Sequence, residues 1–139
     1  MNRIDGKVAV VTGGTQGLGA AIAKLFAEAG ALGIVIVGRD QKKGETVASE
    51  ISKTYGIQAK MITADLEKIE DVQRIIGEAD NIFGRVDILV NSAGLTDRGN
   101  ILDTNPDLFN RMIAVNTCLL YTSDAADDTP CVDLGGRRI

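Results

Sequence analysis

A glycine-rich turn lies near the start of the chain, between an apolar run and an amphipathic, alanine-rich stretch. The run is Val8–Val11, and the turn holds Gly13, Gly17 and Gly19. Glycine lets a backbone turn sharply and approach a ligand closely. A helix that follows such a turn directs free N–H groups and the positive end of its dipole toward an anion. Strand, turn and helix in this order predict a cradle for a nucleotide phosphate, and a glycine turn without a ligand is the alternative.

The glycine spacing separates this turn from two other phosphate-binding motifs. No Gly-Lys-Ser or Gly-Lys-Thr is present, so the turn is not the loop of nucleoside triphosphatases, and G-x-G-x-x-G is also absent. From Thr12 to Gly19 the chain reads T-G-x-x-x-G-x-G. This pattern resembles the compact branch of the short-chain dehydrogenase/reductase family. The extended branch of that family looks more like T-G-x-x-G-x-x-G, which does not match.

Strand and helix patterns alternate over the first 117 residues. Strand patterns lie at residues 8–11, 34–37, 60–63 and 86–90, and helical patterns at 18–29, 41–55 and 66–83, with another opened by Asn105-Pro106. In the third helix, Ile69, Val72, Ile75 and Ile76 are expected to face inward. Regular alternation predicts right-handed βαβ units and a parallel sheet. We expect a Rossmann-like, doubly wound α/β fold with strand order 3-2-1-4, forming an incomplete NAD(P)-binding domain over residues 1–117.

Composition narrows the function classes. A net charge of −4 gives no electrostatic support for binding nucleic acid or a membrane surface. No apolar run reaches the length of a membrane span and no signal peptide is recognised, so a cytoplasmic protein is expected. The chain has no histidine, the commonest metal ligand and general base, and no metal site is predicted. Two cysteines are too few for a disulfide framework.

The family resemblance implies roles for the residues of the glycine turn. The three glycines would hold the cofactor pyrophosphate, and the residues between them would line the same turn. The implied cofactor residues of this turn are Gly13, Thr15, Gln16, Gly17, Leu18 and Gly19. For Thr15, Gln16 and Leu18, an ordinary loop or core role is an equal alternative.

The resemblance also implies roles for residues after the third and fourth strands. Asp65 would receive the adenine amino group and the backbone of Leu66 would contribute, although Asp65 could also cap the third helix. Residues 91–94, Asn-Ser-Ala-Gly, resemble the family's N-N-A-G, with Ser in place of the commoner second Asn. Here Asn91 would tie neighbouring strands together, and Ala93 and Gly94 would leave room for the ribose.

The end of the second strand determines which cofactor is preferred. Gly38 stands where NAD-preferring relatives hold an acid, so no carboxylate repels a 2′-phosphate there. Arg39 offers a cationic, planar fork for that phosphate, and NADP is therefore favoured over NAD. Asp40 could reach a ribose hydroxyl, but capping of the second helix is preferred. Many NADP-using members carry Lys or Arg just before the middle glycine, where this chain has Gln16.

The catalytic residues that the family resemblance implies are only partly present. Asn116 resembles the family's catalytic Asn, whose backbone carbonyl holds a proton-relaying water; an ordinary helix-terminal Asn is the alternative. The other members should be a Ser and a Tyr-x-x-x-Lys, in which Tyr exchanges the proton while hydride moves, and Lys lowers its pKa. Tyr55 and Tyr121 are the only tyrosines, and each is followed four residues later by Ala. We expect that the sequence stops before the catalytic half.

The composition changes abruptly near Thr117. From Cys118 to Asp128 the residues resemble the translation of a transposon-end adaptor used to prepare DNA sequencing libraries, and Cys131 to Ile139 resemble its continuation after a short index. We interpret residues 118–139 as an artefactual, disordered tail. A natural acidic, disordered tail is the alternative.

Together these observations predict the cofactor-binding fragment of an NAD(P)-dependent alcohol dehydrogenase or carbonyl reductase. The complete parent would act on a small alcohol or carbonyl compound and form a homo-oligomer, as its family implies. Two alternatives stay open, a nucleotide-binding module without catalysis and a truncated product without function.

Overall fold

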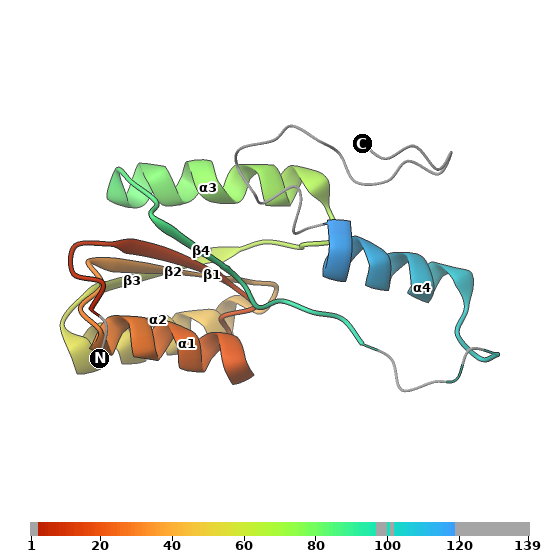
Figure 1. Ribbon diagram of the computed structural model, residues 1–139, viewed down its shortest axis with the longest axis horizontal. Coiled ribbons are helices and arrows are strands. Elements are labelled where there is room, and N and C mark those ends of the chain that lie inside the picture. The colour runs from red at the N-terminus through yellow and green to blue at the C-terminus, as the bar shows by residue number, and fades with distance from the viewer. Residues whose placement is uncertain (1–2, 97–99, 101, 119–139) are drawn as a thin grey trace.

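The computed structural model describes residues 3–96, 100 and 102–118 (Figure 1). It consists of a sheet of four parallel strands and the helices that connect and follow them. The elements are β1 (Val8–Thr12), α1 (Gly17–Glu28), β2 (Gly33–Gly38), α2 (Gln41–Tyr55), β3 (Gln58–Thr63), α3 (Ile69–Phe83), β4 (Ile88–Asn91), α4 (Pro106–Ile113) and the π-helical segment η1 (Ala114–Cys118). The strands pair in the order β3-β2-β1-β4. This confirms the predicted α/β fold and strand order. The predicted tail lies outside the described residues, apart from Cys118.

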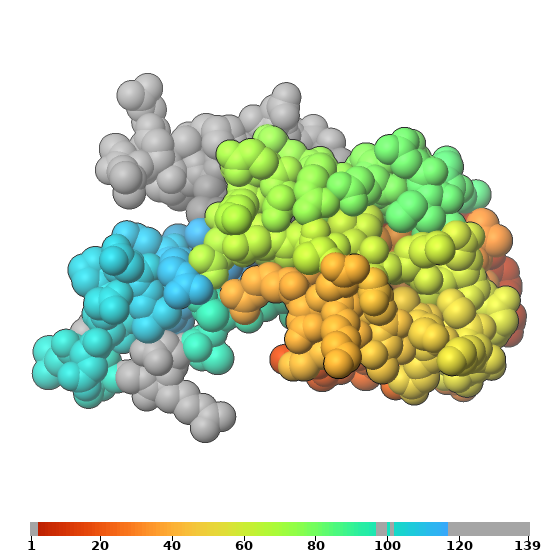
Figure 2. Space-filling model, turned by 180° about the vertical axis from the view of Figure 1, so that it is seen from behind, coloured from red at the N-terminus to blue at the C-terminus, as the bar shows by residue number. Residues whose placement is uncertain are grey.

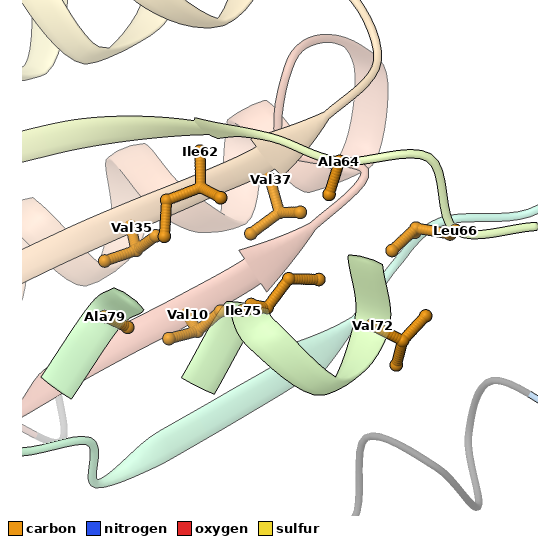
Figure 3. Close-up of a cluster of buried hydrophobic side chains, with 9 residues drawn as sticks. All are labelled: Val10, Val35, Val37, Ile62, Ala64, Leu66, Val72, Ile75 and Ala79. Carbon is orange, nitrogen blue, oxygen red and sulfur yellow. The ribbon is translucent and has the colours of Figure 1, made fainter. Parts of the chain in front are cut away.

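Helices cover both faces of the sheet, with α1 and α2 on one face and α3 on the other (Figure 1). Every residue of β1 and β2 is buried, which is typical of central parallel strands. Successive side chains of a strand point to opposite faces. Val10 therefore packs in the cluster beneath α3 that Figure 3 shows, while Val11 packs in a second cluster with residues of α1 and α2.

The helix ends follow the predicted capping residues in two places. The carboxylate of Asp40 accepts a hydrogen bond from the Lys43 N–H at 3.0 Å, so Asp40 caps α2 as preferred. The side chain of Asn105 likewise accepts from the Leu108 N–H at 2.8 Å, and Pro106 occupies the first turn of α4. Among the described residues, no helix is long and apolar enough to span a bilayer.

Helix α3 begins three residues later than predicted. Asp65 forms a turn in which its side chain accepts from the Glu67 N–H at 3.1 Å and its main-chain oxygen accepts from the Lys68 N–H at 2.9 Å. Asp65 therefore does not cap α3, whose preceding residue Lys68 makes no side-chain cap bond. Ile69, predicted to face inward, is instead 46% exposed, because the helix begins only at this residue and no helical turn precedes it.

Strand β4 begins two residues later than predicted, at Ile88. Just before this start, the carboxylate of Asp87 accepts a hydrogen bond from the main-chain N–H of Val8 at 2.8 Å, and the Asp87 N–H donates to the Val8 carbonyl at 3.0 Å. A side chain thus takes a donor that a strand carbonyl would otherwise take. Regular pairing of β1 with β4 starts one residue further on, between Ala9 and Ile88.

Candidate nucleotide-binding site

A hollow lies at the carboxyl ends of the strands, where ligands bind in open parallel sheets. The loops after β1, β2, β3 and β4 line it, together with one residue of η1. The lining residues are Gly13, Thr15, Gln16, Gly17, Leu18, Gly19, Gly38, Arg39, Ala64, Asp65, Leu66, Glu67, Ser92, Ala93, Gly94, Leu95 and Val115. All the predicted cofactor residues except Asn91 are among them. The predicted catalytic residue Asn116 is not.

The glycine turn closes tightly because two of its residues lack side chains. Gly13 has a φ of +67°, and a Cβ on it would lie 2.7 Å from the main-chain nitrogen of Ala93. A Cβ on Gly19 would overlap the main-chain oxygen of Gly13. Larger residues would push α1 away from the turn and the turn away from the loop after β4. The helix end is thereby held close to the strand ends.

The start of α1 is electrostatically suited to an anion. Gln16, the residue before α1, makes no side-chain cap bond, and the first turn of the helix holds no acidic residue. The first N–H groups of a helix have no partner within the helix, and they carry the positive end of its dipole. A phosphate placed over Gly17 would accept hydrogen bonds from these N–H groups.

Thr12 joins the ends of β1 and β4 beneath the glycine turn. Its hydroxyl donates to the Val90 carbonyl and accepts from the Ala93 N–H, each at 3.4 Å, and the residue is almost fully buried. Thr12 opens the glycine motif, but no spacing in the sequence indicated this bridging contact. Asn91 lies opposite Thr12 in the paired strands and is exposed.

Two side chains of α3, Asp71 and Arg74, hold the loop after β3 in place. The Asp65 N–H donates to the Asp71 carboxylate at 2.7 Å, and Arg74 donates to Asp71 at 3.1 Å and to the Thr63 carbonyl at 2.5 Å. These donors lower the pKa of Asp71 below its usual range, the Asp65 amide foremost. The contacts fix the backbone that presents Asp65 and Leu66 to the hollow. Sequence reasoning missed Asp71 and Arg74.

Glu67 links Arg39 to α4 across one side of the hollow. Its carboxylate accepts two hydrogen bonds from Arg111, at 2.7 and 2.9 Å, and lies 3.8 Å from Arg39 Nη1. Hydrogen bonds from Arg111, with the positive charges of both arginines, lower the pKa of Glu67. Figure 2 shows the start of α2 and the segment before α3 beside α4. No local pattern indicated Glu67, because Arg111 is 44 residues away in sequence.

Asn116 fastens the end of the last helix to the loop after β4. Its Oδ1 accepts from the Leu95 N–H at 2.8 Å, and its Nδ2 donates to the Leu95 carbonyl at 2.7 Å. The residue lies in η1, where the α-helix gives way to π-helical geometry, a change that often marks functional sites. Its neighbour Val115 is buried and lines the hollow. The structure therefore brings Asn116 to the edge of the hollow.

These features define a nucleotide-binding α/β protein, and comparison with known proteins identifies its family. The sequence model of the short chain dehydrogenase family matches residues 7–125. The chain belongs to this family of NAD(P)-dependent oxidoreductases, as its glycine spacing predicted.

Individual relatives agree with this assignment. The chain is 39% identical to a versicolorin reductase of Emericella nidulans, over 83% of this chain and 43% of that protein. It is 38% identical to an uncharacterised oxidoreductase of Staphylococcus aureus, over 100% of this chain and 59% of that protein. The crystal structure of L-sorbose reductase from Gluconobacter frateurii, complexed with NADPH and L-sorbose, matches with a TM-score of 0.84 and 29% identity, covering 90% of this chain and 48% of that one. The chain thus spans about half the length of the relatives it matches.

Proposed function

We propose that this chain is the cofactor-binding half of an NADP-dependent alcohol dehydrogenase or carbonyl reductase. The observation that carries this proposal is the position of Arg39 in the same hollow as the glycine turn, with Gly38 rather than an acid before it. A strand-end cation with Gly38 in place of an acid favours a 2′-phosphate, and the 3.8 Å pair of the exposed Arg39 with Glu67 is weak enough for a phosphate to compete with it. The reductase bound to NADPH, to which this chain is similar in fold and sequence, supports the same cofactor.

The kinds of residue that line the hollow support a dinucleotide as its ligand. The glycine turn presents main chain rather than side chains at the uncapped start of α1, where a pyrophosphate would be held. Asp65 and Leu66 would hold the adenine at one end of the hollow. Ala93 and Gly94 would leave room for the ribose. NADP would supply hydride transfer to or from a carbonyl carbon when bound.

The protein's own residues would position the cofactor and exchange a proton. Asn116 holds the loop after β4 through both polar atoms of its side chain, and we assign it the family's role of supporting the proton relay through its backbone carbonyl. The 139 residues contain no Tyr-x-x-x-Lys. The proton-exchanging Tyr, its Lys and the substrate-contacting residues would come from the remaining length that the relatives have. The complete protein would act on a small alcohol or carbonyl compound, as a homo-oligomer in the cytoplasm.

We also propose that residues 118–139 are not encoded by the natural gene. The resemblance of this stretch to translated adaptor sequence supports this. The family match that reaches residue 125, and the Staphylococcus aureus match over the whole chain, favour a natural continuation instead. Sequencing the uninterrupted gene downstream of the Thr117 codon decides between them. We expect codons for a Ser and a Tyr-x-x-x-Lys there, and a read that reproduces residues 118–139 would refute the proposal.

Turnover by the complete protein, meaning the product of that uninterrupted gene, tests the activity. NADPH and NADH consumption would be measured with a panel of ketones, and NADP and NAD reduction with the matching alcohols. We expect turnover of at least one pair with higher kcat/KM for the phosphorylated cofactor. A protein that binds NADP but turns over none of the panel would instead be a binding module. A protein that neither binds nor reacts would contradict both functions.

A further inference from the structure

A second, more open hollow adjoins the first at the start of α2, and its lining includes two cationic side chains. Thr15, Gln16, Arg39, Asp40, Gln41 and Lys43 line it. The side chains of Arg39 and Lys43 are 64% and 60% exposed, so both can reorient toward a ligand. Within this lining only Asp40 carries a negative charge. The hollow is therefore suited to an anion next to the adenosine ribose of a bound dinucleotide.

The Lys43 side chain crosses from α2 to the glycine turn. Its Nζ lies 3.2 Å from Oε1 of Gln16. Gln16 is the residue just before the middle glycine, and its neutral side chain leaves that position without a charge. Lys43 brings an ammonium group to the same place from a different element.

Asp40 contacts both the main chain and the side chain of Lys43. One carboxylate oxygen accepts the Lys43 main-chain N–H at 3.0 Å, and the other lies 3.9 Å from Nζ. An exposed pair at this distance is weak. A phosphate monoester carries a larger negative charge than a carboxylate, so it would compete well for the ammonium.

We propose that Lys43 is a second specificity-determining cation for the 2′-phosphate of NADP, acting with Arg39. This inference rests on the proposed function, because it needs the adenosine end of the cofactor to lie beside Arg39. It adds a residue that the glycine motif and the strand end do not indicate. Gln16 would accept a hydrogen bond from the ammonium and keep it directed at the hollow.

Binding measurements on matched variants of the complete protein test the inference. Dissociation constants for NADP and NAD would be measured by calorimetry for Lys43→Met, Lys43→Arg, Arg39→Met and Lys42→Met. Lys42 is the control, since it is the adjacent exposed lysine and is not part of the lining. We expect Lys43→Met to weaken NADP about tenfold, as for loss of one charge-assisted contact, and to leave NAD nearly unchanged. Lys43→Arg should retain most NADP affinity, and Lys42→Met should resemble the unmodified protein.

Two results would overturn the inference in distinguishable ways. In the first, Arg39→Met lowers the affinity for NADP selectively, while Lys43→Met has the same affinities as Lys42→Met. Lys43 then has no role, and Arg39 alone recognises the 2′-phosphate. If neither Arg39→Met nor Lys43→Met discriminates NADP from NAD, the proposed cofactor preference fails as well. Thermal unfolding of each variant would verify that affinity losses come from folded protein.

Discussion

At the scale of single residues, the proposed preference for NADP rests on Arg39, the residue that follows β2. Replacing Arg39 with Asp in the complete protein would put a repelling carboxylate where the proposal places the 2′-phosphate. We expect NADP binding to weaken by about 2–3 kcal/mol, the size of a lost charge-assisted hydrogen bond, with a much smaller change for NAD. Titration of both cofactors measures this. Equal losses for the two would show that Arg39 does not read the phosphate.

The second prediction at the scale of single residues concerns Asp87 and the pH dependence of the free energy of unfolding. Arg85 and the Val8 N–H donate to its carboxylate, and Lys7 lies 3.8 Å away, which lowers its pKa from 3.8 to about 2. Because the pKa of Asp87 is lower in the folded state than in the unfolded state, its ionised carboxylate stabilises the fold. This stabilisation is fully present at pH values above the pKa that the group has in the unfolded chain. That contribution is lost as pH falls from about 4 toward 2.

Asp87→Asn should therefore be less stable than the unmodified protein at pH 5 and should lose less stability on acidification through this window. Urea unfolding of the complete protein at several pH values measures the difference. Asp80→Asn, on the exposed surface of α3, is the control for removing a carboxylate. A difference between Asp87→Asn and the unmodified protein that stays constant from pH 5 to pH 2 would contradict the assignment.

At the scale of elements, β4 is an edge of the described sheet. It pairs with β1 on one side only, and its Ile88, Leu89 and Val90 are half-buried. An apolar edge strand without Pro or Lys is a template for pairing with another chain. We expect the 139-residue chain to aggregate as its concentration rises, whereas the complete protein stays at a defined size. Light scattering of both over a concentration series measures this, and a chain that stays monomeric throughout would contradict it.

The elements show which features a sequence can predict. Helix α2 was predicted with its observed bounds, because Asp40 and Gly56 are local end signals and its apolar residues recur at helical spacing. The starts of α3 and β4 were not predicted correctly, because at each of them a side chain forms a hydrogen bond with the main chain. For β4 that contact joins Asp87 to Val8, which are 79 residues apart in sequence.

The residues of the candidate site likewise fall into those that the sequence predicted and those that it did not. Most lining residues stand in motifs at strand ends, where parallel topology alone brings them together. The link from Glu67 to Arg111 and the position of Lys43 beside Gln16 depend on side-chain reach between separate elements. No spacing rule in the sequence contains that information, so only the folded arrangement reveals it.

At the scale of the whole molecule, the chain is expected to bind cofactor without completing the reaction. It contains no Tyr-x-x-x-Lys to exchange a proton beside the nicotinamide. The 139-residue chain, refolded if necessary, should therefore show no NADP-dependent turnover with any alcohol or ketone of the panel. Assays beside the complete protein supply the control. Turnover by the short chain would require a catalytic group outside the predicted set.

Affinity of the complete, unmodified protein for NADP and NAD tests the central claim most directly. Both titrations would be made by calorimetry in the same buffer and salt. The account predicts one binding site per chain, with NADP bound at least about tenfold more tightly than NAD, as one charge-assisted contact to the extra phosphate provides. Equal or tighter binding of NAD, or no binding of either cofactor, would contradict it.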